Sequence, residues 1–139
     1  MDVASTLHAS NIGIAALNLK NNGSAKATTS AKRADLIRIS FTLDPNRIAA
    51  SGNKDVYVCV TGPDGKAISE GASFNTREDG TRAFTSKVSV NYEQGKASQV
   101  SFDWKQAAAF QMGNYKIEIY NNGFKIGEGV TSLKKGGLF

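Results

Sequence analysis

The chain has 139 residues, of which 40% are hydrophobic and 21% are charged, and this balance excludes a chain without a folded core. Its single cysteine, Cys59, excludes an intramolecular disulfide, and no run of residues reaches the roughly 18–20 apolar positions of a membrane span. The formal net charge of +5 is uneven, because residues 1–34 carry four bases and one acid whereas residues 35–139 carry thirteen bases and eleven acids. These bases are scattered singly, which predicts no specific nucleic-acid binding and only weak, salt-sensitive contact with anionic polymers.

The first predicted strand covers Leu7–Leu19, where Ile12 and Ile14 alternate with small or polar residues. Gly and Asn inside this stretch disfavour a helix, because both residues have low helix propensity. The alternation changes phase across Ala15-Ala16, and this change predicts a β-bulge at that point.

The segment after this strand, Asn21–Lys32, is small, polar and basic, and we expect it to be a loop. Residues 1–34 are therefore expected to form a first strand plus a flexible basic loop, with a short helix over Ser30–Ala34 as an alternative. The first eight residues lack the basic and apolar regions of a secretory signal, so the sequence alone does not assign a compartment.

The clearest strand is Leu36–Leu43, where apolar side chains occupy every second position from Ile37 onward. Asp55–Val60 repeats the pattern with three valines. Turns are expected at Asp44–Asn46, where proline removes a ladder donor, and at Gly62–Gly65, where proline presets the backbone and glycine closes the turn.

The second half of the chain alternates in the same way and ends in a β-hairpin. Asn122-Gly123 is a pair that tolerates the positive φ angles of a tight turn, and alternating runs flank it on both sides. One stretch, Lys105–Met112, favours a helix that Gly113 would end. The remaining strands are expected at Lys66–Ser69, Phe74–Thr76, Thr81–Ser86, Lys87–Tyr92, Gln99–Trp104, Tyr115–Ile119 and a final run that ends at Leu133.

Seven to nine short strands with one apolar and one polar face predict an all-β fold, an immunoglobulin-like antiparallel β-sandwich. We expect a single domain over residues 1–139, with its core at about 35–133 and a tail at 134–139. Gly113-Asn-Tyr115 before an alternating strand is similar to the corner that enters the penultimate strand of immunoglobulin-like folds.

Several segments together resemble a group of uncharacterised proteins from Bacteroidetes-type bacteria. The segments that carry the resemblance are residues 34–46, 51–57, 60–66, 103–104, 113–120 and 123–127. In that group a membrane-proximal helical or coiled-coil stalk precedes a C-terminal β-sandwich, so the resemblance implies a location in the periplasm or cell envelope. It also implies a polar, outward residue at position 59, where this chain has Cys59.

The sequence contains no convincing catalytic or metal-binding set. His8 is the only histidine, and one histidine with Cys59 does not make a usual zinc site or nucleophile–base pair. Glu78-Asp79 and Asp64 lie in expected turns without the spacing of a calcium loop. We therefore predict no enzyme activity, no cofactor, no metal, and a Cys59 without a catalytic or ligand role.

The aromatic residues divide by strand parity. Trp104, Phe102 and Tyr92 have inward parity, whereas Tyr57 and Tyr120 have outward parity and are the candidate binding residues. Two functions stay open. The first is a non-catalytic cell-envelope interaction module that binds a protein partner or assembles with itself. The alternative is a carbohydrate-binding or enzyme-accessory β-sandwich, which an exposed row of aromatic side chains would favour.

Overall fold

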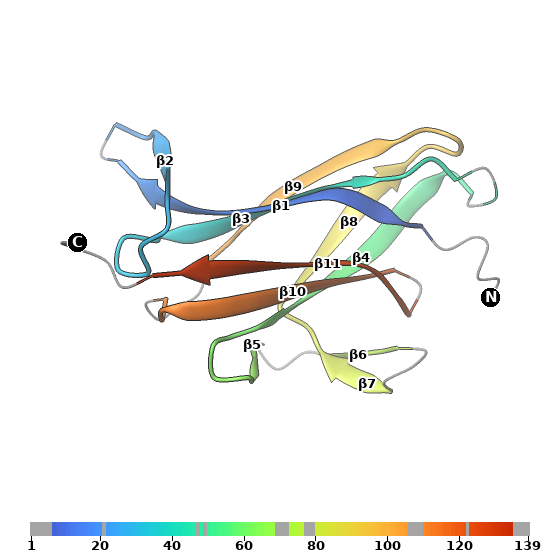
Figure 1. Cartoon of the computed structure of the whole chain (residues 1–139). Coiled ribbons are helices and arrows are strands. Elements are labelled where there is room, and N and C mark those ends of the chain that lie inside the picture. Colours follow the sequence, from blue (N-terminus) through green and yellow to red (C-terminus); the bar gives the residue numbers. More distant parts are fainter. Residues whose placement is uncertain are drawn as a thin grey trace.

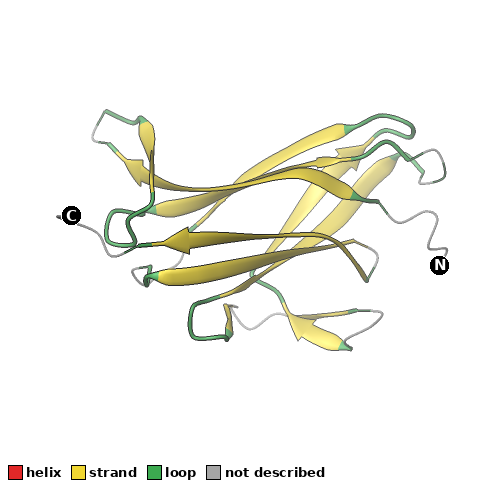
Figure 2. Ribbon diagram, viewed as in Figure 1, coloured by secondary structure: helices red, strands yellow, loops and turns green. Residues whose placement is uncertain are grey.

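The computed structural model describes residues 7–20, 22–46, 48, 50–68, 73–76, 80–105, 110–121 and 123–134, and these form strands but no helix (Figures 1 and 2). The strands are β1 (Ala9–Leu19), β2 (Ala25–Thr28), β3 (Leu36–Leu43), β4 (Gly52–Thr61), β5 (Ala67–Ile68), β6 (Ser73–Asn75), β7 (Thr81–Ala83), β8 (Ser86–Tyr92), β9 (Ser98–Trp104), β10 (Gly113–Asn121) and β11 (Phe124–Leu133). The fold is all-β, as predicted.

Two antiparallel sheets face each other. The first sheet has the order β2-β1-β3-β9, and the second has the order β11-β10-β4, with both β5 and β8 paired to β4. The chain crosses between the sheets three times, from β3 to β4, from β8 to β9 and from β9 to β10, in the Greek-key manner of immunoglobulin-like sandwiches. Seven strands have seven or more residues, in agreement with the prediction, and the short strands β2, β5, β6 and β7 add to them.

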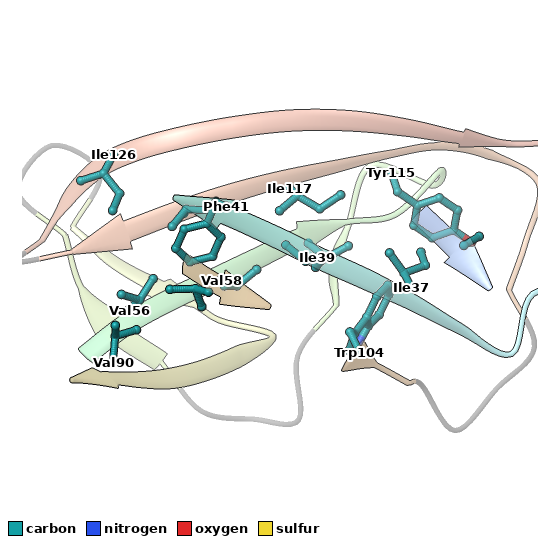
Figure 3. Close-up of a cluster of buried hydrophobic side chains, with 14 of the residues drawn as sticks. Ile37, Ile39, Phe41, Val56, Val58, Val90, Trp104, Tyr115, Ile117 and Ile126 are labelled. Atoms are coloured by element: carbon teal, nitrogen blue, oxygen red, sulfur yellow. The ribbon is translucent and has the colours of Figure 1, made fainter. Parts of the chain in front are cut away.

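The core fills the space between the two sheets (Figure 3). From the first sheet, Ile37, Ile39 and Phe41 of β3 are at most 1% exposed. From the second sheet, Val58 of β4 and Ile117 of β10 are fully buried opposite them. Trp104 and Tyr92 are also buried and Phe102 packs against the same cluster, so the predicted inward faces of these strands are confirmed.

Tyr115 forms the corner that the sequence suggested at the start of β10. Its hydroxyl donates to the carbonyl oxygen of Gln111 at 2.7 Å and accepts the N–H of Gln111 at 2.8 Å. Burial raises the pKa of Tyr115, which keeps the hydroxyl protonated and able to donate. Gly113 has φ 130°, and a Cβ there would lie 2.6 Å from Cβ of Pro63, so glycine is required.

The predicted bulge in the first strand lies elsewhere. β1 pairs with β3 without a shift from Gly13 to Leu17, so the prediction of a bulge at Ala15-Ala16 is wrong. The register shift instead falls between Ser10 and Gly13. The prediction took Leu17 as an inward residue, but Leu17 is buried outside the central core. Ala16 faces the core and keeps the alternation of the strand unbroken.

The predicted loop at Asn21–Lys32 contains a strand, because β2 pairs with the end of β1. Ser30–Ala34 is a turn and not a helix, since the N–H groups of Arg33 and Ala34 both donate to the carbonyl oxygen of Ser30. Most of the helix predicted over Lys105–Met112, namely residues 106–109, lies outside the described residues, as do residues 135–139 of the tail.

Candidate functional site

The two candidate tyrosines lie side by side on the outer face of the second sheet. Tyr57 of β4 and Tyr120 of β10 are cross-strand partners, and they contact a small apolar cluster separate from the core. The β6–β7 hairpin covers this cluster: the ring of Phe74 stacks on Tyr57 at 4.4 Å and meets Tyr120 edge-on at 5.3 Å. Tyr120 is only 2% exposed, so its assignment to an exposed contact surface is wrong, and Tyr57 is half-buried.

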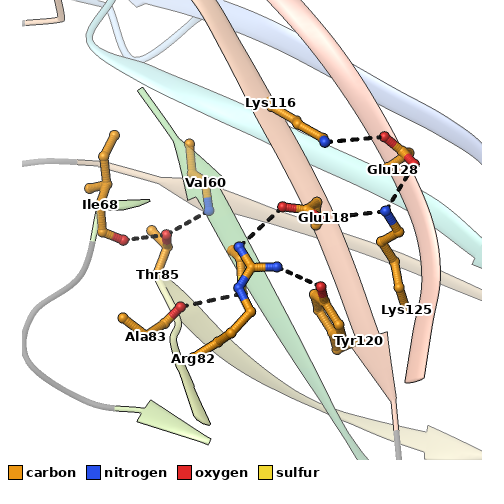
Figure 4. A network of polar contacts seen from close by, with 11 residues as sticks. Val60, Ile68, Arg82, Ala83, Thr85, Lys116, Glu118, Tyr120, Lys125 and Glu128 are labelled. Carbon is orange, nitrogen blue, oxygen red and sulfur yellow. Dashed lines mark hydrogen bonds and ion pairs between the residues drawn. The ribbon is translucent and has the colours of Figure 1, made fainter. Parts of the chain in front are cut away.

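A salt bridge fastens the same hairpin to the sheet (Figure 4). Arg82 of β7 lies 3.1 Å from a carboxylate oxygen of Glu118 on β10, and its guanidinium also donates to the hydroxyl of Tyr120. Burial alone would raise the pKa of Glu118, but the hydrogen bond and charge of Arg82 outweigh it and lower that pKa. Burial alone would lower the pKa of Arg82, but the Glu118 carboxylate outweighs this effect and raises the pKa of Arg82.

Glu118 has further cationic partners. Nζ of Lys125 lies 3.5 Å from its second oxygen, and Lys125 also pairs with Glu128 at 3.1 Å. Glu128 in turn reaches Lys116 at 3.8 Å. The Glu118 carboxylate is paired with Arg82 and Lys125 and stays ionised, so it is a poor proton acceptor. The network instead holds the hairpin against the sheet.

Cys59 lies beneath the same hairpin, opposite Glu118 across the β4–β10 pairing. It is 1% exposed, and its thiol donates to the carbonyl oxygen of Ala83 at 3.4 Å. Burial raises the pKa of Cys59 to about 11, so the thiol is protonated at neutral pH. The hairpin therefore explains why an apolar thiol is tolerated at this outward position. His8 is exposed beside Asp44 on the first sheet, so the structure does not bring His8 and Cys59 together.

The predicted turn carboxylates are not gathered into a site in the part of the chain that the structure describes. Asp64 accepts the N–H of Lys66 at 3.0 Å, which is ordinary turn chemistry. Glu78 and Asp79 lie outside the described residues. Within residues 7–134, apart from the undescribed gaps, no three His, Cys, Asp or Glu side chains are close enough together to hold a metal ion.

A groove runs along one open side of the sandwich, between β8 and β9. Each of these strands has one partner among the described strands, since β8 pairs with β4 and β9 pairs with β3. The groove has a volume of about 410 Å³. It is lined by Val88, Ser89, Val90, Asn91, Ser98, Gln99, Val100 and Ser101. Sequence reasoning found both strands but missed the groove, because nothing in their patterns shows that they join different sheets.

No helix among the described residues is long and apolar enough to cross a membrane. A comparison with the sequences of curated proteins finds no match. Among solved structures, similarity extends over 92% of the chain to a GH3 β-glucosidase of Bifidobacterium adolescentis, with 12% identity and a TM-score of 0.54, covering 17% of that protein. A β-D-glucoside glucohydrolase of Trichoderma reesei matches 94% of the chain with 10% identity and a TM-score of 0.56, covering 19% of that protein.

A third similar structure is the alkylpurine DNA glycosylase AlkC of Pseudomonas fluorescens, bound to DNA containing an abasic site analog. It matches 92% of the chain with 14% identity and a TM-score of 0.52, covering 30% of that protein. The chain spans less than a third of each of these three proteins, and the likeness shows the fold alone. A family model matches residues 10–134, nearly the whole chain, and the chain therefore belongs to the family described as "Domain of unknown function (DUF8428)".

Proposed function

We propose that this domain is a non-catalytic interaction module that takes up an extended strand of a protein partner in the groove between β8 and β9. The observation that supports it is the pair of strand edges that border one groove without a strand between them. A strand edge presents a row of backbone donors and acceptors, and an added strand satisfies them.

The floor of the groove suits such a guest. Val90 and Val100 are buried at its base, and Val88 is half-buried beside them, so apolar side chains at every second position of a guest strand would pack there. The rim carries serine, asparagine and glutamine, which favour a guest without strong charge.

The other edges of the two sheets are protected. β11 carries Lys125 and Glu128 and lies against β1, where a Cβ on Gly127 would come within 2.7 Å of Cδ1 of Ile12. β2 has four residues and carries Lys26, and β5 has only two residues. Folded proteins shield edges with charges, proline or short strands. The groove stretches Val88–Asn91 and Ser98–Ser101 contain neither charge nor proline, so they are the edge available for pairing.

The absence of catalysis is part of the proposal. Its support is that the ionisable groups beneath the hairpin are held in one state: the Cys59 thiol is protonated, and Glu118 is paired with Arg82 and Lys125. Neither group is free to exchange a proton or attack a substrate.

The carbohydrate-binding alternative depends on exposed aromatic rings, which stack on sugars. None of the phenylalanine, tyrosine or tryptophan side chains in the described residues is exposed, and Tyr57, Phe74 and Tyr120 contact one another. The β-glucosidase neighbours share the fold only, so we favour the protein partner. The cell-envelope location rests on the sequence resemblance and stays a prediction.

Selection from a phage-displayed peptide library tests the proposal. We expect the selected peptides to have small apolar residues at alternating positions and to slow amide hydrogen exchange in both β8 and β9. Val88→Lys, which points a charge into the groove, should reduce binding at least tenfold, whereas Val130→Lys on exposed β11 should leave it unchanged.

The melting temperature of each variant separates loss of binding from loss of fold, and Ser101→Lys on the exposed rim is a second variant with less risk to folding. Sedimentation over a range of protein concentrations shows whether a second copy fills the groove in place of a partner. Peptides that protect amides elsewhere, or that bind the Val88→Lys variant equally well, would refute the proposal.

A further inference from the structure

Three segments that carry five basic residues meet at the end of the sandwich where β2 lies (Figure 1). Strand pairing and backbone hydrogen bonds bring these segments together: the β1–β2 hairpin, the turn at 30–34 and the end of β11. We call this set the basic end: Lys20, Lys26, Lys32, Arg33 and Lys134.

Specific contacts fix the three segments. Lys26 lies opposite Asn18, and the Asn18 side-chain amide donates to the carbonyl oxygen of Arg33 at 2.8 Å. The N–H of Lys134 donates to the carbonyl oxygen of Thr29 at 2.7 Å. The segments that carry the bases therefore lie side by side, although they are spread over more than a hundred positions of the sequence.

The charges of the basic end are not neutralised. All five side chains are exposed, and none of them has an ion pair among the described residues, whereas six other described cations do. The nearby acid, Asp35, accepts the N–H of Leu19 at 2.6 Å, and its single negative charge leaves a net positive charge on the basic end. Unpaired cations held close together repel one another, and an anionic partner relieves that repulsion.

Exposed apolar side chains stand among these charges. Leu19 is 42% exposed next to Lys20, and Met112 is 59% exposed. Met112 precedes Gly113, the strand partner of Leu133, and so lies at the same end as Lys134. These are two of the four large hydrophobic side chains that are exposed in the described residues.

We infer that the basic end is a peripheral binding surface for an anionic lipid bilayer. Lysine and arginine are attracted to the negative surface of such a bilayer, and neighbouring apolar side chains enter its interface. A nucleic acid satisfies the cations but offers little to Leu19 and Met112, and single strands additionally bind to exposed aromatic rings, which the described residues lack. This inference is independent of the strand-binding groove.

Co-sedimentation with vesicles tests the inference. The protein should pellet with vesicles of phosphatidylcholine and phosphatidylserine and stay in solution with phosphatidylcholine alone. Lys26→Glu combined with Lys32→Glu should weaken binding roughly tenfold or more, because each basic residue near the surface contributes separately. Leu19→Ser combined with Met112→Ser should weaken it as well.

The matched control reverses two charges at the other end of the sandwich, Lys54→Glu with Lys96→Glu, and should leave vesicle binding within a factor of about three. Val88→Lys should also bind vesicles normally, which separates this surface from the groove. Failure of the native protein to pellet with anionic vesicles overturns the inference. A second result would also overturn it: the protein binds a DNA duplex as tightly as it binds vesicles, and the Leu19 and Met112 substitutions do not weaken the binding to DNA. The surface would then recognise polyanions in general.

Discussion

The inner core and the outer aromatic cluster lie on opposite faces of the same strand, β4, and they are closed by different means. Val56, Val58 and Val60 point inward to the core, whereas Tyr57 and Cys59 point outward. A complete second sheet covers the inner face. A hairpin with two three-residue strands covers the outer face.

The two regions differ in how strongly their burial depends on the rest of the fold. The core is enclosed by long strands, and backbone hydrogen bonds join these strands within each sheet. We therefore expect the core to open only when the whole sandwich unfolds. The outer cluster is enclosed by Phe74 and by the Arg82–Glu118 pair. A segment held by few buried contacts opens locally, and the free energy of this local opening is lower than that of unfolding the whole domain.

Removal of one phenyl ring from each region gives the largest effects. Phe41→Ala, in the core, should lower the free energy of unfolding by about 3–5 kcal/mol, because Phe41 is 1% exposed. Phe74→Ala should cost about 1–3 kcal/mol, because the hairpin can relax around the gap. Urea denaturation measures both values, and equal losses would contradict the contrast between the two regions.

Glu118→Gln should have an intermediate effect, about 1–2 kcal/mol at pH 7, because it leaves Arg82 partly buried without its carboxylate. The pKa of Glu118 is lowered in the folded state, so its contribution is fully present above the usual value of 4.5 and is lost as the pH falls below that. The stability difference between the native protein and Glu118→Gln should therefore be constant from pH 7 to about pH 5 and shrink at lower pH.

Lys125→Gln is the control for this experiment. Lys125 is more exposed than Arg82, and its removal should cost under about 0.5 kcal/mol. A stability difference between the native protein and Glu118→Gln that grows on acidification would show that Glu118 does not fasten the hairpin as an ionised group.

Cys59→Val should give the smallest effect, under about 1 kcal/mol, since a similar volume fills the space and only a weak thiol hydrogen bond is lost. The thiol also reports on the hairpin. Its reaction with a disulfide reagent at neutral pH should be slow in the native protein and at least about tenfold faster in Phe74→Ala, where the cover opens more often. Equal rates in both proteins would mean that the hairpin does not control access to Cys59.

Much of the fold could be predicted from the sequence, because inward and outward residues alternate along each long strand. The pattern of Ile37, Ile39 and Phe41 places one face in the core whatever the neighbouring strand is. The corner at Tyr115 could be predicted as well, since it is a local contact between residues four positions apart.

The cover over Tyr57 and Tyr120 could not be predicted. Parity assigns both side chains to the outer face, but it does not show that Phe74 and Arg82 return over that face from a separate hairpin. The same limit applies to the β8–β9 groove and to β2, a short strand of alanine, lysine and threonine that is defined by its pairing with β1 and not by its own pattern.

Contacts between the first segments of the chain and its last strands bear on how the protein is made. The N–H of Leu7 donates to the side-chain oxygen of Asn121 at 3.2 Å, and the turn after β2 is bonded to Lys134. A ribosome must therefore release more than a hundred further residues before the first strand has all of its partners. Because contacts so distant in sequence slow folding, the domain should fold in one step once β11 is available. Although β2 and β3 can pair with β1 early, the side chains of β1 that pack against β11 stay exposed until then to other chains and to chaperones.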